Sequence, residues 1–211
     1  MKGCEMPNLK KILLSLGALF TIANSGGCVL VQDGKMNVRW DAYKTDSRIT
    51  VHGKFTDVQY TPKALEGKNF REILVGSKVS MAGSKIDTEI VSRDDTIVKF
   101  FFNKLSTGKI EGIISDIKAD ERIKGKPRTG IITVEITFNG KKKTVPMNYN
   151  YYKEDFSATG SINLADFSAL DALASIDNRC RDLYKGKIWS DVTIKFNTTI
   201  KATLCNVEIK K

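Results

Sequence analysis

The stretch WSDVTIKFNTTIKATLC, residues 189–205, decides the fold. Its apolar or β-branched side chains stand at every second position, and polar side chains alternate with them; the first set is Val192, Ile194, Phe196, Thr198 and Ile200. This period of two predicts a strand with one dry and one wet face. The strand is long beside the usual length of about five or six residues, so it needs long partners on both sides. We therefore expect one antiparallel sheet that curls.

Further segments of the chain show alternation or end at turn residues, and we expect strands over Met36–Ala42, Ile49–Phe55, Leu74–Ile86, Lys109–Ala119, Arg128–Phe138, Val145–Tyr151 and Phe156–Leu164. Asn139-Gly140 predicts a two-residue hairpin turn, which needs positive φ at both positions. Ser92, as an N-cap, and the segment Leu170–Ile176 indicate two short helices. The pattern favours an all-β fold, an antiparallel barrel of about eight strands that is closed or nearly closed, because closure removes exposed edges.

The first 25 residues are expected to be a secretory signal peptide. Lys10 and Lys11 precede the apolar run Ile12–Ala23, and small residues follow it. Cleavage near Ser25 is one reading. The other is a degenerate lipobox, with cleavage before Cys28 and lipidation of that cysteine. Either reading predicts export, and the folded domain is expected to span residues 36–205.

The cysteines fit an exported chain, in which disulfides form readily. Cys180 and Cys205 are expected to pair, closing a loop worth about 3–4 kcal/mol in the chain-entropy model. Cys28 is then left over, and an unpaired exported cysteine is what lipidation and membrane association would explain.

The formal net charge of +10 raises the question of nucleic acid. The lysines are spread along strands and turns, with one short run at Lys141–Lys143, and no nucleic-acid motif accompanies them. We expect no nucleic-acid partner. Attraction to an anionic membrane surface is compatible with this charge.

Residues for catalysis are scarce in this sequence. His52 is the only histidine, and it falls on the polar face of its predicted strand. There is no Cys-x-x-Cys, no glycine-rich phosphate loop and no His-Glu-x-x-His. We expect no enzyme activity, no metal and no cofactor; a lipid hydrolase or isomerase that uses His52 is the remote alternative.

The inner face of the predicted barrel is either filled by side chains or hollow enough for one ligand. Small residues recur on this face and are expected to open a channel: Ala42, Gly53, Ala158, Gly160 and Ala202. Large flat or long side chains would line the channel, among them Trp40, Phe138, Met147, Tyr149 and Phe196. Such a lumen suits an alkyl or isoprenoid chain, which gains about 0.8 kcal/mol per buried methylene.

Four motifs, in order, resemble the YceI-like lipid- and polyisoprenoid-binding family. They are the run Val51–Val58, Ile86-Asp87-Thr88 with Arg93-Asp94-Asp95 and Phe100–Phe102, the run Phe156–Asn163 with Asp166-Phe167, and Trp189–Val192. The resemblance covers roughly residues 37–202. It implies a lipocalin-like barrel in the bacterial periplasm that holds an isoprenoid quinone, another polyisoprenoid or a fatty amide. The family's histidine near the first strand is absent, with Tyr43 and Lys44 in that region, so no head-group residue is carried over.

Pattern and resemblance together predict the ligand-binding residues Trp40, Phe55, Phe100, Phe102, Phe138, Met147, Tyr149, Phe156, Phe167, Ile194 and Phe196. The leading hypothesis is a non-enzymatic periplasmic carrier of a long-chain amphiphile. The alternative is an envelope interaction or stress-response module with a filled barrel. Two barrels could also pair as a homodimer, which the sequence leaves open.

Overall fold

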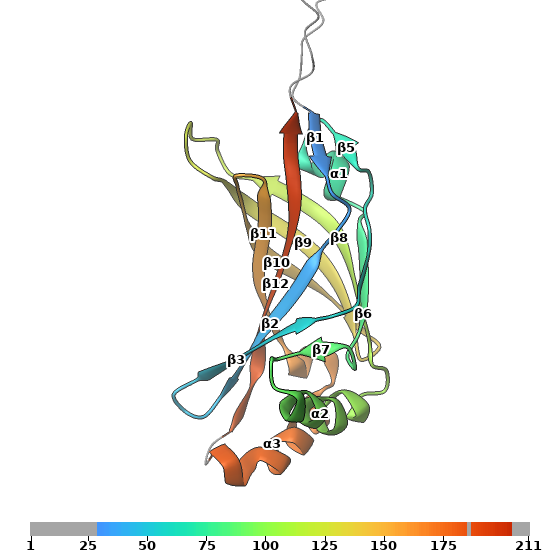
Figure 1. The fold of residues 1–211 in the computed structure, drawn as a ribbon, viewed down its shortest axis with the longest axis vertical. Helices are drawn as coiled ribbons and strands as arrows, with labels where there is room; N and C mark the ends of the chain where they lie inside the picture. The colour runs from blue at the N-terminus through green and yellow to red at the C-terminus, as the bar shows by residue number, and fades with distance from the viewer. Residues whose placement is uncertain (1–28, 185–186, 204–211) are drawn as a thin grey trace, which may run out of the picture.

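The strand predicted from residues 189–205 is the longest element that the computed structural model describes, within residues 29–184 and 187–203. This strand, β12 (Ile188–Thr203), runs for 16 residues. It pairs with β11 (Asp155–Asn163) along one edge and with β2 (Asn37–Lys44) along the other. Its far end also pairs with β1 (Val29–Gln32). The long alternating stretch is therefore the strand around which the sheet is built (Figure 1).

The sheet order is β4-β6-β8-β9-β10-β11-β12-β2-β3-β7, and every pair is antiparallel. The remaining strands of this order are β3 (Ile49–Phe55), β4 (Val58–Thr61), β6 (Lys78–Ala82), β7 (Ile86–Asp87), β8 (Lys109–Ala119), β9 (Arg128–Phe138) and β10 (Lys141–Tyr152). A short strand, β5 (Glu66–Gly67), pairs only with β1.

The two ends of this order are joined by the chain itself. Strand β3 passes into β4 through Thr56 and Asp57, and β6 passes into β7 through residues 83–85. Because β3 pairs with β7 and β4 pairs with β6, these two bent strands lie side by side. With each bent strand counted once, the ten strands of the order become eight in the described chain. The antiparallel eight-stranded barrel predicted from the sequence is confirmed.

Among the described residues, three α-helices cover the ends of the barrel: α1 (Phe70–Leu74), α2 (Val91–Phe100) and α3 (Leu170–Tyr184). Two 3₁₀ turns in the same part of the chain, η1 (Phe102–Lys104) and η2 (Leu164–Phe167), adjoin them. Helices α2 and α3 lie together at the end opposite to α1 (Figure 1). The barrel thus has one end covered by a single short helix and another covered by a helix pair.

The helix predictions need correction. Helix α3 has 15 residues and does not stop at Ile176. Ser92 is not an N-cap, since α2 begins at Val91 after Ile90, which makes no side-chain cap. The strand expected from Leu74 to Ile86 begins only at Lys78, because Asn69 caps α1 by accepting the N–H of Glu72, and the apolar end of α1 is buried in the core. The turn at Asn139 and Gly140 has the expected positive φ values of 48° and 71°.

Candidate functional site

A cavity of about 670 Å³ lies inside the barrel, on the side of α2 and α3. Its walls are the inward rows of the strands, where the alternation places apolar side chains. Strand β2 contributes Val38, Trp40 and Ala42, and β12 contributes Val192, Ile194 and Phe196. The opposite wall comes from β8 and β9. An apolar cavity of this size is within the usual range of about 300–1,000 Å³ for small-molecule sites.

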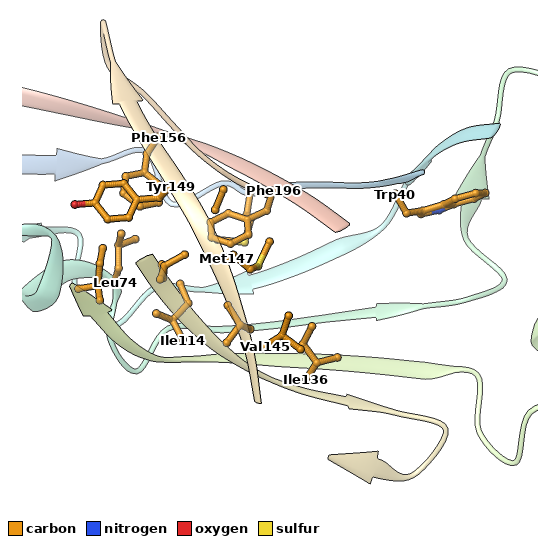
Figure 2. Close-up of a cluster of buried hydrophobic side chains, with 14 of the residues drawn as sticks. Trp40, Leu74, Ile114, Ile136, Val145, Met147, Tyr149, Phe156 and Phe196 are labelled. Atoms are coloured by element: carbon orange, nitrogen blue, oxygen red, sulfur yellow. The ribbon is translucent and has the colours of Figure 1, made fainter. Parts of the chain in front are cut away.

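Aromatic rings fill the other end of the barrel. The Phe70 ring from α1 lies with its centroid 5.0 Å from that of Tyr151 and 5.2 Å from that of Phe156. Tyr149 stacks on Phe156 at 5.1 Å. Figure 2 shows Tyr149 and Phe156 together in this cluster, with Trp40 well apart from them. These rings close the barrel beneath α1, so the cavity is closed at that end.

The end near α2 and α3 is polar at its rim. Lys44, Arg93 and Arg179 line it, from β2, α2 and α3 respectively, together with Ser92 and Thr96. No residue of α2 is buried, although Ile97 packs partly against the core. Ile90, which precedes α2, both lines the cavity and is 48% exposed. The helical end is therefore where the cavity meets solvent.

Seven of the predicted ligand-binding residues line this cavity: Trp40, Phe55, Phe102, Phe138, Met147, Ile194 and Phe196. Phe156 and Phe167 do not, because they are 0% and 1% exposed within the packed core. Tyr149 belongs to the aromatic end and lines a separate hollow of about 480 Å³ with Phe70 and Arg128. Phe100 lies outside, its ring contacted by the cations of Lys99 and Arg179.

The sequence predicted that five small residues on the inner face open a channel. In the structure, not all of them do so. A Cβ on Gly53 would collide with the Trp40 ring, and a Cβ on Gly160 would lie 2.6 Å from Cγ of Met147. These glycines make room for large neighbours that are packed against them. Ala202 is exposed. Of the five, Ala42 lines the cavity, as predicted.

Sequence reasoning missed the wall that the helices supply. Ile97 from α2 and Leu173, Ile176 and Cys180 from α3 all line the cavity. The three α3 residues recur at spacings of three and four, which is typical of the apolar face of a helix. The signal was present, but the helix was expected to end at Ile176.

Two buried polar groups have no hydrogen-bond partner in the described chain: the indole N–H of Trp40 and the hydroxyl of Tyr149. Trp40 lines the main cavity and Tyr149 the separate hollow. Both groups lack accessible surface, so they are held by the packing of their rings. Their burial adds to the desolvation cost of the core.

His52 lies on the outer face of β3, and 76% of its side chain is exposed. Its Nδ1 is 2.7 Å from Oδ1 of Asp41, whose Oδ2 accepts a hydrogen bond of 2.5 Å from Lys195. Burial alone would raise the pKa of Asp41, but the hydrogen bonds from Lys195 and His52 outweigh it and lower the pKa. Among the described residues, no cluster of His, Cys, Asp or Glu could hold a metal ion.

The expected disulfide is not found in the described residues. Cys180 carries a free, buried thiol in α3, and Cys205 lies outside those residues. The pairing of Cys180 with Cys205 therefore stays a prediction.

The predicted signal peptide, its two cleavage positions and Cys28 also lie outside the described residues. Within the described chain, no helix has the length and apolar character needed to cross a bilayer.

Comparisons with known proteins agree with the barrel. The model of the YceI-like domain family matches residues 31–200. A polyisoprenoid binding domain from Saccharophagus degradans, implicated in plant cell wall breakdown, has a TM-score of 0.54 and 10% identity, covering 82% of this chain and 98% of that one. For BcnA from Burkholderia cenocepacia the TM-score is 0.50 and the identity 17%, over 81% and 99%. At such identities both structures speak for the fold alone. No curated protein matches the sequence.

Proposed function

This chain belongs to the YceI-like domain family, and we propose that its cavity binds the hydrocarbon chain of a long-chain amphiphile. The observation that carries the proposal is the 670 Å³ cavity with apolar walls, closed by aromatic rings at one end and open between helices at the other. A hydrocarbon chain in such a site gains about 0.8 kcal/mol for each methylene removed from water.

The proposed role is that of a carrier. Burial of a hydrocarbon chain in an apolar cavity needs no catalytic group and no cofactor. The name of the Saccharophagus degradans domain supports an isoprenoid as one ligand class; an isoprenoid quinone and a fatty amide are the others. We place the protein in the periplasm, exported by residues 1–25 and tethered to the membrane if Cys28 is lipidated. Whether two barrels pair is a separate question for solution measurements.

The filled-barrel interaction module would need an interior that is too dense to admit a ligand. The cavity weighs against that reading. A hydrolase that uses His52 is also disfavoured, since this side chain is exposed on the outer face and does not line the cavity.

Displacement of a fluorescent long-chain fatty acid tests the carrier role. Ile162 on β11 lines the cavity, and its neighbour Ser161 is exposed on the outer face. Ile162→Trp should fill space in the cavity and weaken binding at least about tenfold, or 1.4 kcal/mol. Ser161→Trp is the matched control and should bind as the unchanged protein does, with thermal melting to confirm that both variants fold. Equal binding by both variants, or no binding by the unchanged protein, would contradict the proposal.

A further inference from the structure

The cations at the helical rim of the cavity come from three different elements. They are Lys44 of β2, Arg93 of α2 and Arg179 of α3. This rim is therefore cationic, although most of the cavity wall is apolar.

Two of these cations, Lys44 and Arg179, lie on elements that adjoin at the rim. Lys44 is the last member of the inward row of β2, after Val38, Trp40 and Ala42, and its backbone pairs with Ile188 of β12. Arg179 precedes Cys180 in α3. The backbone N–H of Ile188 also donates to Asp177, which lies two residues before Arg179. Ile188 therefore joins the end of β2 to the part of α3 that carries Arg179.

Arg179 has no carboxylate partner among the described residues. Its guanidinium lies 5.7 Å from the ring centroid of Phe100 and forms none of the ion pairs of the described chain. The nearby carboxylate of Asp177 is engaged elsewhere: it accepts the N–H of Ile188 at 2.8 Å and lies 3.6 Å from Arg181. A guanidinium presents several N–H donors in a planar fork that matches a carboxylate or a phosphate.

From this arrangement we propose that Lys44 and Arg179 bind the anionic head group, a carboxylate or a phosphate, of the amphiphile whose chain fills the cavity. The inference rests on the proposed function and narrows it. The chain enters the apolar interior, and the head group stays at the rim between β2 and α3. Neutral head groups such as quinones and amides would gain less there, because they accept hydrogen bonds from the cations but carry no opposite charge that the cations attract.

Matched ligand pairs test this assignment. Hexadecanoic acid is compared with hexadecan-1-ol, and farnesyl phosphate with farnesol, by displacement of a neutral fluorescent alkyl probe. The measured quantity is the ratio of the two Kd values within each pair. In the unchanged protein the anion should bind about tenfold or more tightly than the alcohol. The double variant K44Q/R179Q should bring this ratio close to one.

The control variant K141Q/K143Q removes the same charge from exposed positions of β10, away from the cavity, and should keep the preference. A preference in only one ligand pair identifies the head group as carboxylate or phosphate and supports the assignment. Equal affinities for anion and alcohol in the unchanged protein would overturn the head-group site while leaving the carrier role in place. A preference that survives in K44Q/R179Q would overturn the role of these two residues. Failure of all four ligands to bind would instead remove the proposed function on which the inference rests.

Discussion

Trp40 shows how single residues shape the cavity. Its ring lies over Gly53 of the neighbouring strand, directly opposite in the register of β2 and β3. Only a residue without a Cβ leaves room for the ring in this place, so Gly53 fixes the position of one cavity wall. Trp40 is buried, with 8% of the residue exposed.

Gly53→Ala should therefore destabilise the protein by about 1–3 kcal/mol, since the new methyl group overpacks the site and displaces Trp40. Urea unfolding followed by circular dichroism measures the change. Gly108→Ala is the control, because a Cβ at Gly108 meets no atom within 4 Å. Similar urea unfolding midpoints for the two variants would show that a Cβ at position 53 does not displace the Trp40 ring.

A second prediction for a single residue concerns the contribution of Asp41 to stability, which depends on pH. Its pKa is lower in the folded protein than in the unfolded chain, through Lys195 and His52, although burial acts the other way. The folded state therefore binds fewer protons, and the stabilisation is present above the unfolded pKa and is lost as the pH falls through the folded pKa. Asp41→Asn should cost about 1 kcal/mol at neutral pH, and its deficit should shrink in acid. A deficit that stays constant between neutral and acidic pH in urea unfolding would refute this account.

Among the elements, the β9–β10 hairpin is tied to two other segments by its turn residue. The Oδ1 of Asn139 accepts hydrogen bonds from the backbone N–H of Ser106, at 2.8 Å, and from its hydroxyl. The Nδ2 donates to the carbonyls of Phe167 and Ser168, each at 3.0 Å. One side chain thus links the hairpin to the loop before β8 and to the end of η2.

Asn139→Gly should cost about 1–2 kcal/mol, because glycine accepts the positive φ but makes none of these hydrogen bonds. Thermal and urea unfolding measure the loss. The control is Lys153→Gly, at a residue with the same φ of 48° in an exposed turn and no such links, which should be neutral or slightly stabilising. Equal stability for Asn139→Gly and Lys153→Gly would mean that the side-chain hydrogen bonds of Asn139 contribute nothing to the free energy of unfolding.

The strands could be predicted from sequence better than the helices. A period of two held over β9 and β12 is a strong signal, and β8 and β9 have the expected bounds. The bounds of helix α1 could not be predicted, because its five residues are too few for a helical period to show. The end of α3 was misplaced because mostly polar and charged residues follow Ile176, although Cys180 continues the helical spacing of Leu173 and Ile176.

At the scale of the molecule, the residues of the inner face could be predicted from the sequence. The division of the barrel interior into a packed aromatic end and a cavity could not. The alternation identifies side chains that point inward, including Phe196 and Phe156, which lie on neighbouring strands. It does not tell which of them contact one another. Phe156 became part of the closed end because α1 brings Phe70 onto it, and this is a contact between segments distant in sequence. Phe196 lies at the boundary and lines the cavity.

The central claim, that this cavity carries a long-chain amphiphile, is tested most directly by extraction. The protein purified from a bacterial periplasm is extracted with organic solvent, and the extract is examined by mass spectrometry beside that of Ile162→Trp. The account predicts a long-chain species in stoichiometric amount from the unchanged protein and a much smaller amount from the variant. An extract without such a species, even after incubation with membrane lipids, would contradict it.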